Sequence, residues 1–209
     1  MADLAFETAV QKEHGHTRIA GLDEAGRGAL AGPVVAAAVI LPLDNPEKLA
    51  HLREVNDSKQ VTAKKREAFY DLITAHALAF GVGAVSAAEI DEIGIVPSTR
   101  RAMQVALAQL AVAPDYLLID GRIRLAAVNL PQASIIRGDS LSLSIAAASI
   151  LAKVTRDRLM VALAEDYPCY GLERHKGYGT AVHLSALIEH GPALIHRHSF
   201  APIRQSLFE

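Results

Sequence analysis

The chain has 209 residues, of which 51% are hydrophobic and 21% are charged, and its net charge is only −2. This balance supplies enough apolar side chains for a folded core, and it excludes both a disordered chain and a uniformly basic nucleic-acid binder. A single cysteine, Cys169, excludes an intramolecular disulfide and a cysteine zinc cluster, and it fits a reducing cytoplasm. No apolar run approaches the ~18 residues of a membrane-spanning helix, so we expect a cytoplasmic protein without a membrane contact.

The first two strands are predicted over residues 18–24 and 34–41, where short apolar runs flank a glycine-rich turn. We expect these strands to pair in antiparallel fashion. The first run ends on two adjacent carboxylates, Asp23 and Glu24. Burial of unpaired charge is strongly unfavourable, and a hard divalent cation is a natural partner for such carboxylates. The sequence therefore predicts a metal site at the end of the first strand.

The glycine-rich turn also has a rival interpretation as a dinucleotide-binding loop. Its spacing is G-x-G-x-x-x-G rather than G-x-G-x-x-G, and an apolar strand-like run follows where a cofactor fold needs a helix N-terminus. The two acids beside the turn would also repel a pyrophosphate. We therefore reject the dinucleotide interpretation.

The rest of the chain alternates helical and strand patterns. Further strands are predicted over residues 77–85, 116–120 and 133–136. Helices are predicted over residues 63–75, from 87 to near 94, from 98 onward, over 141–165 and over 181–190. The expected N-caps of the first three helices are Thr62, Ser86 and Ser98.

These elements predict an α/β core over residues 1–168 and a small helical extension over residues 169–209. The extension differs from the core in holding five histidines, at positions 175, 183, 190, 196 and 198. The pair His196 and His198 flanks an arginine, and its role is left unassigned.

Two further strand ends carry acids. Asp120 ends the strand predicted over 116–120, and Asp139 follows the strand predicted over 133–136. Because open α/β sheets place ligand chemistry at strand ends, these acids are expected to converge with Asp23 and Glu24. Aspartate beside glycine is also a common turn-former, which is the competing interpretation for either acid alone. Neighbouring residues of a regular strand point to opposite faces, so how Glu24 reaches the same site stays open.

Four carboxylates in one cleft suit two Mg²⁺ or Mn²⁺ ions, the arrangement used for in-line displacement at phosphorus. In such a mechanism one metal activates the attacking water, and the other stabilises the leaving 3′-oxygen.

Several blocks, in order and at compatible spacing over residues 18–202, resemble the type 2 ribonuclease H family, ribonuclease HII. The blocks are Gly21–Gly28, Asn56–Lys59, Leu118–Gly121, Gly138–Asp139 running into Ser144–Lys153, Thr155–Asp157 and His175–Thr180. The resemblance implies a ribonuclease H-like mixed β-sheet flanked by helices, with a small C-terminal helical extension. It also implies metal-dependent hydrolysis on the 5′ side of ribonucleotides, in RNA–DNA hybrids and singly within duplex DNA, which leaves 3′-hydroxyl and 5′-phosphate ends.

The resemblance also assigns roles to residues. The implied catalytic metal ligands are Asp23, Glu24, Asp120 and Asp139, with two Mn²⁺ or Mg²⁺ ions as cofactors. The loop formed by Gly26, Arg27 and Gly28 would sense the ribose 2′-hydroxyl through its backbone, which glycine leaves open to close approach. Tyr178 would stack on the sugar beyond the ribonucleotide; packing at a helix start is its alternative role.

Phosphate contacts are predicted for four cations, Lys59, Arg137, Lys153 and Arg156, because positive side chains beside a cleft hold backbone phosphates. A solvated helix face explains Lys153 and Arg156 almost as well. We expect a monomer that binds RNA–DNA hybrid and ribonucleotide-containing duplex DNA. The C-terminal Gln205–Phe208 partly matches a sliding-clamp-binding tail, although a frayed end explains it better.

Two other functional classes stay open at this stage. A nuclease for all-DNA junctions would share the four acids but would have no need of a 2′-hydroxyl sensor. A catalytically silent nucleic-acid-binding module is the third class, and the intact set of acids argues against it.

Overall fold

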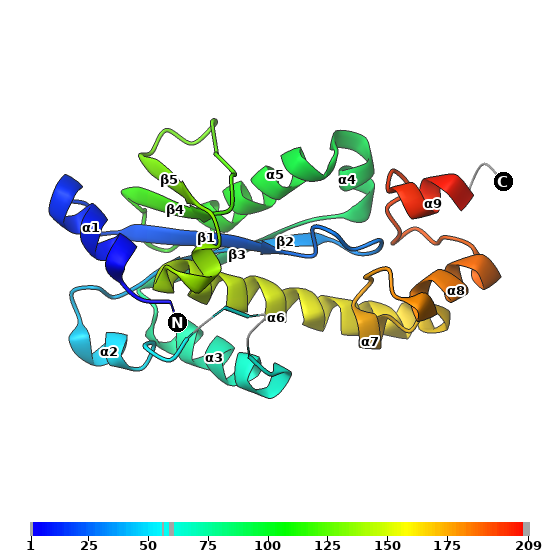
Figure 1. Ribbon diagram of the computed structural model, residues 1–209, viewed down its shortest axis with the longest axis horizontal. Helices are drawn as coiled ribbons and strands as arrows, with labels where there is room; N and C mark the ends of the chain where they lie inside the picture. Colours follow the sequence, from blue (N-terminus) through cyan, green and yellow to red (C-terminus); the bar gives the residue numbers. More distant parts are fainter. Residues whose placement is uncertain (1, 56, 59–60, 207–209) are drawn as a thin grey trace.

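The computed structural model describes residues 2–55, 57–58 and 61–206 (Figure 1). Its centre is a five-stranded mixed sheet in the order β3-β2-β1-β4-β5. The strands are β1 Ile19–Ala25, β2 Val34–Ile40, β3 Ala79–Val85, β4 Tyr116–Asp120 and β5 Gln132–Ile135. β1, β2 and β3 pair antiparallel, whereas β4 and β5 run parallel to β1. The predicted antiparallel pair at the start of the chain is thus confirmed.

Helices cover both faces of the sheet. The helices are α1 Ala5–His14, α2 Pro46–Ala50, α3 Ala63–His76, α4 Ala87–Ile93, α5 Ile95–Ala108, α6 Leu143–Asp166, α7 Leu172–His175, α8 Ala181–His190 and α9 Ala201–Ser206. Two 3₁₀ turns join them, η1 Gly138–Ser140 and η2 Pro168–Tyr170. In Figure 1, α4 and α5 lie above the sheet, and α6 with α3 lies below it. This mixed sheet with flanking helices confirms the predicted fold class.

β2 lies at the centre of the packing because every one of its residues is buried. Its side chains alternate between the two faces of the sheet. Ala37 and Val39 join the apolar core formed with α6 and α3, while Ala36 and Ala38 join the core formed with α5. The continuous apolar run of this strand therefore serves two cores at once.

α6 lies close against β1. At Gly21 a Cβ would overlap the backbone of Ser144 and Ile145, so only glycine allows this approach. Asp23 lies two residues farther along the same face of β1 and is therefore directed toward α6.

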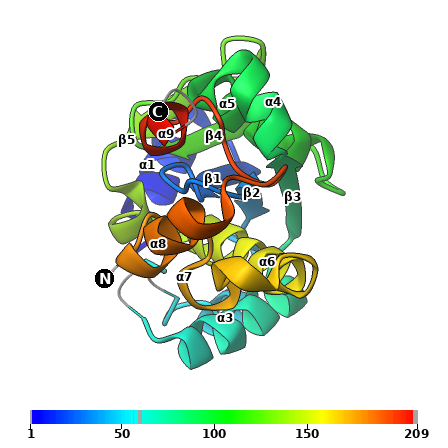
Figure 2. The same cartoon turned by 90° about the vertical axis from the view of Figure 1, so that its right-hand side faces the viewer.

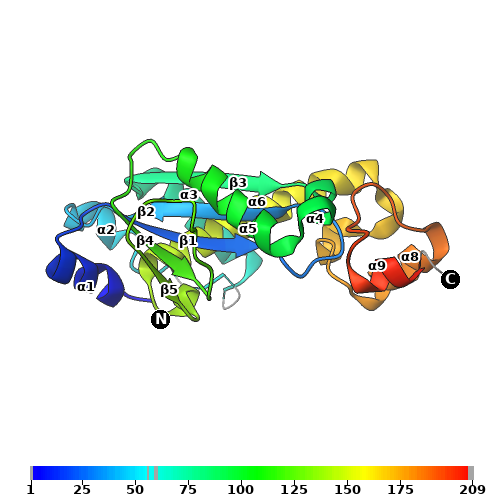
Figure 3. The same ribbon diagram turned by 90° about the horizontal axis from the view of Figure 1, so that it is seen from above.

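The extension after α6 forms its own small apolar cluster around the end of that helix. This cluster consists of Ala31, Met160, Tyr170, Leu172 and Ala186. Figure 2 shows α7 and α8 beside α6, and Figure 3 shows the loop after β1 extending toward α8 and α9. The extension therefore adjoins the glycine-rich turn.

Two of the three predicted helix caps are confirmed. Thr62 accepts a hydrogen bond from the backbone N–H of Lys65, and Ser86 forms a capping box with Glu89. The prediction for Ser98 was wrong: α5 begins at Ile95, and the Ser98 hydroxyl donates to the carbonyl of Gly94 at 2.8 Å. Gly94, with φ of 82°, reverses the chain between α4 and α5, so the helix starts directly after it.

Four helices, α1, α2, α7 and α9, were not predicted. α1 has no side-chain cap at its N-terminus, and it is held instead by Glu7, whose Oε1 accepts hydrogen bonds from Ser142 and Ser144 at the start of α6. None of the helices in the described ranges combines the length and apolar character that crossing a bilayer requires.

Candidate active site

Three aspartates converge at one end of the sheet. Asp23 on β1 and Asp120 on β4 lie side by side, because the parallel register of these strands pairs Leu22 with Ile119 one step earlier. Asp139 lies in η1, between β5 and α6. One carboxylate oxygen from each aspartate lies within 4.8 Å of the others. The predicted convergence of strand ends is therefore found for these acids.

A tight turn brings the third aspartate to the other two. Asp120 Oδ1 accepts a hydrogen bond from the backbone N–H of Gly138 at 2.6 Å. At Gly138 a Cβ would lie 2.6 Å from Cδ1 of Ile145 and 3.3 Å from Oδ1 of Asp120, so a larger residue would have to displace these side chains. Asp120 thus stabilises the turn and belongs to the carboxylate group, so both interpretations of this residue hold.

The electrostatics of Asp23 show how unfavourable this grouping is without a cation. Burial, followed by the charges of Glu24 and Asp120, raises the pKa of Asp23 well above its usual range. The backbone N–H of Glu24, at 2.7 Å from Asp23 Oδ1, and the Ser149 hydroxyl oppose this shift. A set of converging carboxylate oxygens is the donor set that a hard divalent cation prefers, so these residues fit a magnesium or manganese ion.

Glu24 does not belong to the group of three. It follows Asp23 in the regular pairing of β1 with β2, so its side chain starts from the opposite face of the sheet. Its Oε1 lies 3.4 Å from Nη1 of Arg27, and its side chain is 12% exposed. Nevertheless, Glu24 and Asp23 both line one cavity, so the longer side chain does reach the same region.

This cavity, of about 430 Å³, joins two of the acids, Asp23 and Glu24, to the predicted substrate contacts. The predicted site residues that line it are Asp23, Glu24, Gly26, Arg27, Gly28, Lys153 and Tyr178. Ser58 and Ser149 complete its wall. A slightly larger hollow of about 480 Å³ lies between α3 and α6, and none of the predicted site residues lines it. The smaller cavity is therefore the candidate active site.

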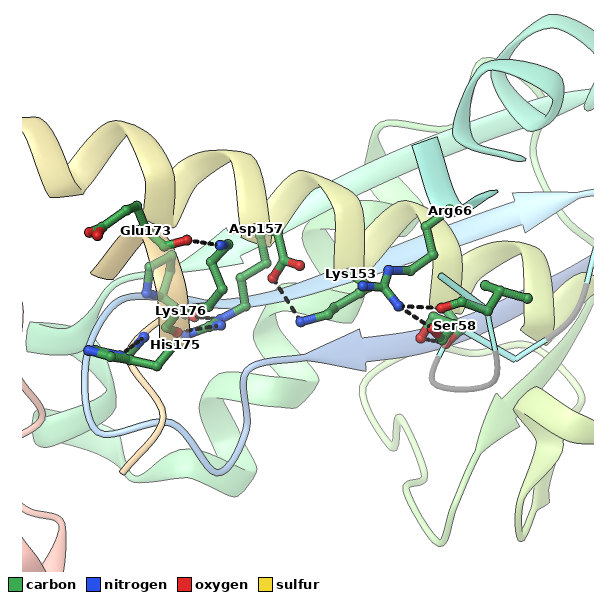
Figure 4. A network of polar contacts seen from close by, with 12 residues as sticks. Ser58, Arg66, Lys153, Asp157, Glu173, His175 and Lys176 are labelled. Atoms are coloured by element: carbon green, nitrogen blue, oxygen red, sulfur yellow. Dashed lines mark hydrogen bonds and ion pairs between the residues drawn. The ribbon is translucent and has the colours of Figure 1, made fainter. Parts of the chain in front are cut away.

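Tyr178 and Lys153 form one side of the cavity. The Tyr178 side chain is 37% exposed, and Nζ of Lys153 lies 5.8 Å from the centre of its ring. Lys153 also donates to Oδ1 of Asp157 at 2.8 Å along α6 (Figure 4). This pairing holds the lysine ammonium at the cavity wall.

Arg156 does not fit the predicted role of a phosphate contact. Its side chain is fully buried, and it donates to the carbonyls of Pro33, Lys176 and Ala31 at 2.9, 3.0 and 3.1 Å. Burial lowers its pKa from the usual arginine value. The guanidinium occupies the space where a side chain at Gly26 would lie, and Gly26 has a positive φ of 86°. Arg156 thus supports the glycine-rich turn from behind.

The sequence analysis missed a second buried arginine. Arg197 donates to the carbonyl of Gly32 through Nε and Nη2 at 3.0 and 2.9 Å, and to the carbonyl of Arg27 through Nη1 at 3.0 Å. Burial and the charge of Arg156 lower its pKa to about 9. His196 and His198 flank Arg197 in the sequence, but no sequence signal shows that the partners of its guanidinium are backbone carbonyls.

The remaining predicted cations differ in position. Arg137 is exposed beside Asp139 and has a positive φ of 58°. Lys59 lies outside the described residues. Beside it, Ser58 is held by its contact with the Ser149 hydroxyl at 2.9 Å and by Arg66, which donates to its carbonyl at 2.8 Å (Figure 4). Ser58, Ser149 and Arg66 were not predicted, although Ser58 and Ser149 lie within the recognised blocks.

Comparison with known proteins decides the family. The family model described as Ribonuclease HII matches residues 20–203. The chain belongs to the ribonuclease HII family. The curated ribonuclease HII of Chloroflexus aurantiacus is 52% identical over 207 residues, which cover 99% of this chain and 97% of that protein.

Solved structures of ribonucleases H share the fold. The crystal structure of ribonuclease H2 from Pyrococcus horikoshii OT3 has a TM-score of 0.76 and 27% identity, and covers 90% of this chain and 96% of that one. The structure of the PCNA–ribonuclease HII complex from Archaeoglobus fulgidus has a TM-score of 0.74 and 26% identity. The match covers 88% of this chain and 95% of that one. As a member of this family, the protein is an endoribonuclease acting on RNA–DNA hybrids, as its sequence blocks implied.

Proposed function

We propose that the enzyme hydrolyses the phosphodiester on the 5′ side of ribonucleotides, both in RNA–DNA hybrids and singly within duplex DNA, leaving 3′-hydroxyl and 5′-phosphate ends. One observation carries this proposal: a single cavity joins Asp23 and Glu24 to the Gly26–Gly28 turn and to Tyr178, and Asp23 in turn lies against Asp120 and Asp139. Hydrolytic chemistry thus lies beside a stretch of backbone suited to inspecting a ribose.

Asp23, Asp120 and Asp139 would hold the metal ions, with Glu24 contributing from the side of the same cavity. Two Mg²⁺ or Mn²⁺ ions bound there supply activation of the attacking water and neutralisation of charge on the leaving 3′-oxygen. The protein orients the oxygen donors: Ser149 and the backbone N–H of Glu24 fix the Asp23 carboxylate, and Gly138 fixes that of Asp120.

The Gly26–Gly28 turn is suited to sense the 2′-hydroxyl. Gly28 is exposed, and the space where its Cβ would lie is open, so a ribose can approach the backbone there. Arg156 and Arg197 hold the carbonyls behind the turn, which keeps the facing backbone in one conformation. A 2′-hydroxyl both donates and accepts hydrogen bonds, and it distinguishes RNA from DNA at such a position.

Tyr178 would stack on the sugar that follows the ribonucleotide, from the half-exposed position that it occupies at the cavity. Lys153, Arg27 and Arg137 would contact the phosphates, since all three lie at or beside the acidic group and keep solvent access. Tyr178 comes from residues 169–209, so we propose that this extension completes the substrate cleft of the core over 1–168.

We propose that the enzyme acts as a monomer, since the cavity of one chain brings together Asp23, Glu24, the Gly26–Gly28 turn and Tyr178. The Archaeoglobus relative forms a complex with PCNA. The clamp-binding segment predicted here, Gln205–Phe208, lies partly outside the described residues, so a clamp contact stays a prediction.

The decisive experiment uses a DNA duplex with one ribonucleotide, an all-DNA duplex as control, and Mg²⁺, Mn²⁺ or chelator. We expect one metal-dependent cut, immediately 5′ of the ribonucleotide. Cleavage that survives complete chelation would contradict the metal mechanism. Cutting of the all-DNA duplex at a comparable rate would instead support the junction nuclease, and cutting of long hybrids alone would remove the proposed sensing of single ribonucleotides.

A further inference from the structure

Three histidines form a hydrogen-bonded network behind the segment that carries Tyr178. His183 and His196 are fully buried, and their Nε2 atoms lie 3.1 Å apart. The ring of His175 stacks on that of His183, with centroids 4.5 Å apart and an angle of 17° between the planes. None of these histidines lines the cavity, so the proposed chemistry leaves them without a role.

The backbone groups around the network determine where its protons lie. A peptide N–H can only donate and a carbonyl can only accept. The N–H of Gly177 points at Nδ1 of His175 at 3.2 Å, so His175 carries its proton on Nε2 and donates to the carbonyl of Tyr170 at 2.7 Å. The N–H of Ala193 likewise points at Nδ1 of His196 at 2.9 Å, so His196 also carries its proton on Nε2.

His183 completes the chain of donors. Its Nδ1 lies 3.0 Å from the carbonyl of Tyr178 and donates to the second lone pair of this oxygen, which also accepts the backbone N–H of Thr180 at 2.8 Å. Its unprotonated Nε2 then accepts a hydrogen bond from the Nε2–H group of His196. The carbonyl of Ala193, also near Nδ1 of His196 at 3.2 Å, already accepts the backbone N–H of His196 at 2.9 Å. One neutral tautomer of each ring therefore satisfies all these contacts.

A further proton would break this arrangement. His183 could take one only on Nε2, where it would meet the N–H of His196, and His196 could take one only on Nδ1, where it would meet the N–H of Ala193. Burial lowers the pKa of both rings, in the case of His196 to about 4, which agrees with two neutral side chains.

The segment held by this network has a strained backbone. Lys176 and Gly177, directly before Tyr178, have positive φ values of 53° and 79°. A left-handed conformation is unfavourable for lysine and persists only where its surroundings impose it. His175 holds the N–H of Gly177, Arg156 holds the carbonyl of Lys176, and His183 holds the carbonyl of Tyr178.

We propose that His183, oriented by His196, is a positioning residue that fixes the Tyr178 carbonyl and thereby directs the tyrosine ring to the cavity. The proposal rests on the substrate contact proposed for Tyr178. The proposal gives the buried pair of His183 and His196 a role in substrate binding in addition to its role in packing.

Two substitutions of His183 separate positioning from packing. In His183→Asn the amide nitrogen takes the place of Nδ1 and keeps the donor to Tyr178. In His183→Gln the amide takes the place of Nε2, which keeps the link to His196 and removes that donor. We expect the Asn variant to stay within about twofold of wild-type kcat/KM on the single-ribonucleotide duplex, and the Gln variant to lose about tenfold.

Coupling to Tyr178 is the second readout. In a Tyr178→Ala background, we expect His183→Gln to lower kcat/KM by less than a further factor of about two. His183 acts through the tyrosine ring, which the first substitution has already removed. His190→Gln, on the same helix but partly exposed, is the matched control. Equal losses for the Asn and Gln variants, or full additivity with Tyr178→Ala, would overturn the proposal.

A spectroscopic measurement on the unmodified protein keeps the test independent of activity and of variant folding. The ¹⁵N chemical shifts of the imidazoles at neutral pH should show the Nδ1–H tautomer for His183 and the Nε2–H tautomer for His175 and His196. Any other assignment refutes the network. If Tyr178→Ala leaves activity unchanged while these tautomers are found, the proposed function of Tyr178 fails and the proposal falls with it.

Discussion

Two regions beside the cavity are built on opposite principles: the group of Asp23, Asp120 and Asp139, here called the acidic side, and the buried pair Arg156 and Arg197 that supports the glycine-rich turn, here called the opposite side. On the acidic side, Asp23, Asp120 and Asp139 place like charges within a few ångströms, and burial further disfavours the charge on Asp23. On the opposite side, Arg156 and Arg197 donate from buried positions to backbone carbonyls. The charges of the acidic side repel one another until a cation binds, whereas the hydrogen bonds of the opposite side are already made within the protein.

This contrast separates function from stability. Removing a charge from the acidic side relieves repulsion, so it should reduce catalysis without weakening the fold. Removing a donor from the opposite side leaves buried carbonyls unsatisfied, so it should weaken the fold and the substrate contacts together. Each variant below tests whether the two sides behave in these different ways.

Asp139→Asn should have the largest effect. We expect turnover of an RNA–DNA hybrid to fall by at least about 100-fold, because the metal site proposed for the three aspartates loses one charge. The melting temperature without metal should stay equal or rise slightly, and the rise on addition of Mn²⁺ should shrink. Hybrid cleavage and calorimetry measure these effects, with Asp166→Asn, at the exposed end of α6, as the control. A large loss of thermal stability would place Asp139 among the structural residues instead.

Arg197→Ala should have the next largest effect, and on stability as well as activity. It removes donors from the carbonyls of Gly32 and Arg27, and we expect a loss of about 3 kcal/mol in the free energy of unfolding. Arg197→Lys should restore only part of this loss, because a lysine ammonium cannot reproduce the planar fork. Urea unfolding measures both variants.

The matched control for this arginine is Arg158→Ala, since Arg158 of α6 is 50% exposed and pairs with Glu67 of α3 on the surface. We expect that variant to change the free energy of unfolding by less than about 1 kcal/mol. Similar losses for the two arginine variants would remove the distinction between the buried donors and the surface charges.

Tyr178→Ala should have a smaller and more selective effect. We expect cleavage at a single ribonucleotide to fall about tenfold and cleavage of long hybrids to fall less, because only the junction substrate depends on one stacked sugar. Tyr178→Phe should retain most of the activity, since the ring and not the hydroxyl makes the contact. Steady-state kinetics on the two substrates tests this, and equal losses on both would argue for a packing role.

The acidic side of the site could be predicted from the sequence because its signal is local. The apolar runs that end on Asp23 and Asp120 predict the two strands, and they also predict that the acids lie at the strand ends. Parallel pairing of β1 with β4 then brings these strand ends together. Glu24 shows the limit of this reasoning, since the pleat directs it away and only the length of its side chain returns it to the cavity.

The opposite side could not be predicted, because its partners are backbone carbonyls far away in the chain. Arg197 contacts Gly32, 165 positions earlier, and Arg156 contacts Pro33, 123 positions earlier. A carbonyl carries no side-chain signature, so the sequence shows the charge of an arginine and not its burial. This is why Arg156 was assigned to phosphate. Glu7 was missed for a related reason: its partners are side-chain hydroxyls, of Ser142 and Ser144, but they lie 135 and 137 positions away in the chain.

The last expected effect is a dependence of stability on pH that differs in sign between Asp23 and His196. Burial lowers the pKa of His196 from 6.5 to about 4, so the unfolded chain binds a proton more readily and the stability from this residue is lost as the pH falls from about 6.5 to about 4. The raised pKa of Asp23 acts in the opposite direction, since protonation on acidification favours the folded state. We expect the histidine contribution to be about 1–3 kcal/mol. The difference in unfolding free energy between the wild type and His196→Gln, measured in chelator from pH 7 to pH 4, isolates it. This difference should shrink steadily with acidification, and a constant difference would show that His196 is not held neutral by its burial.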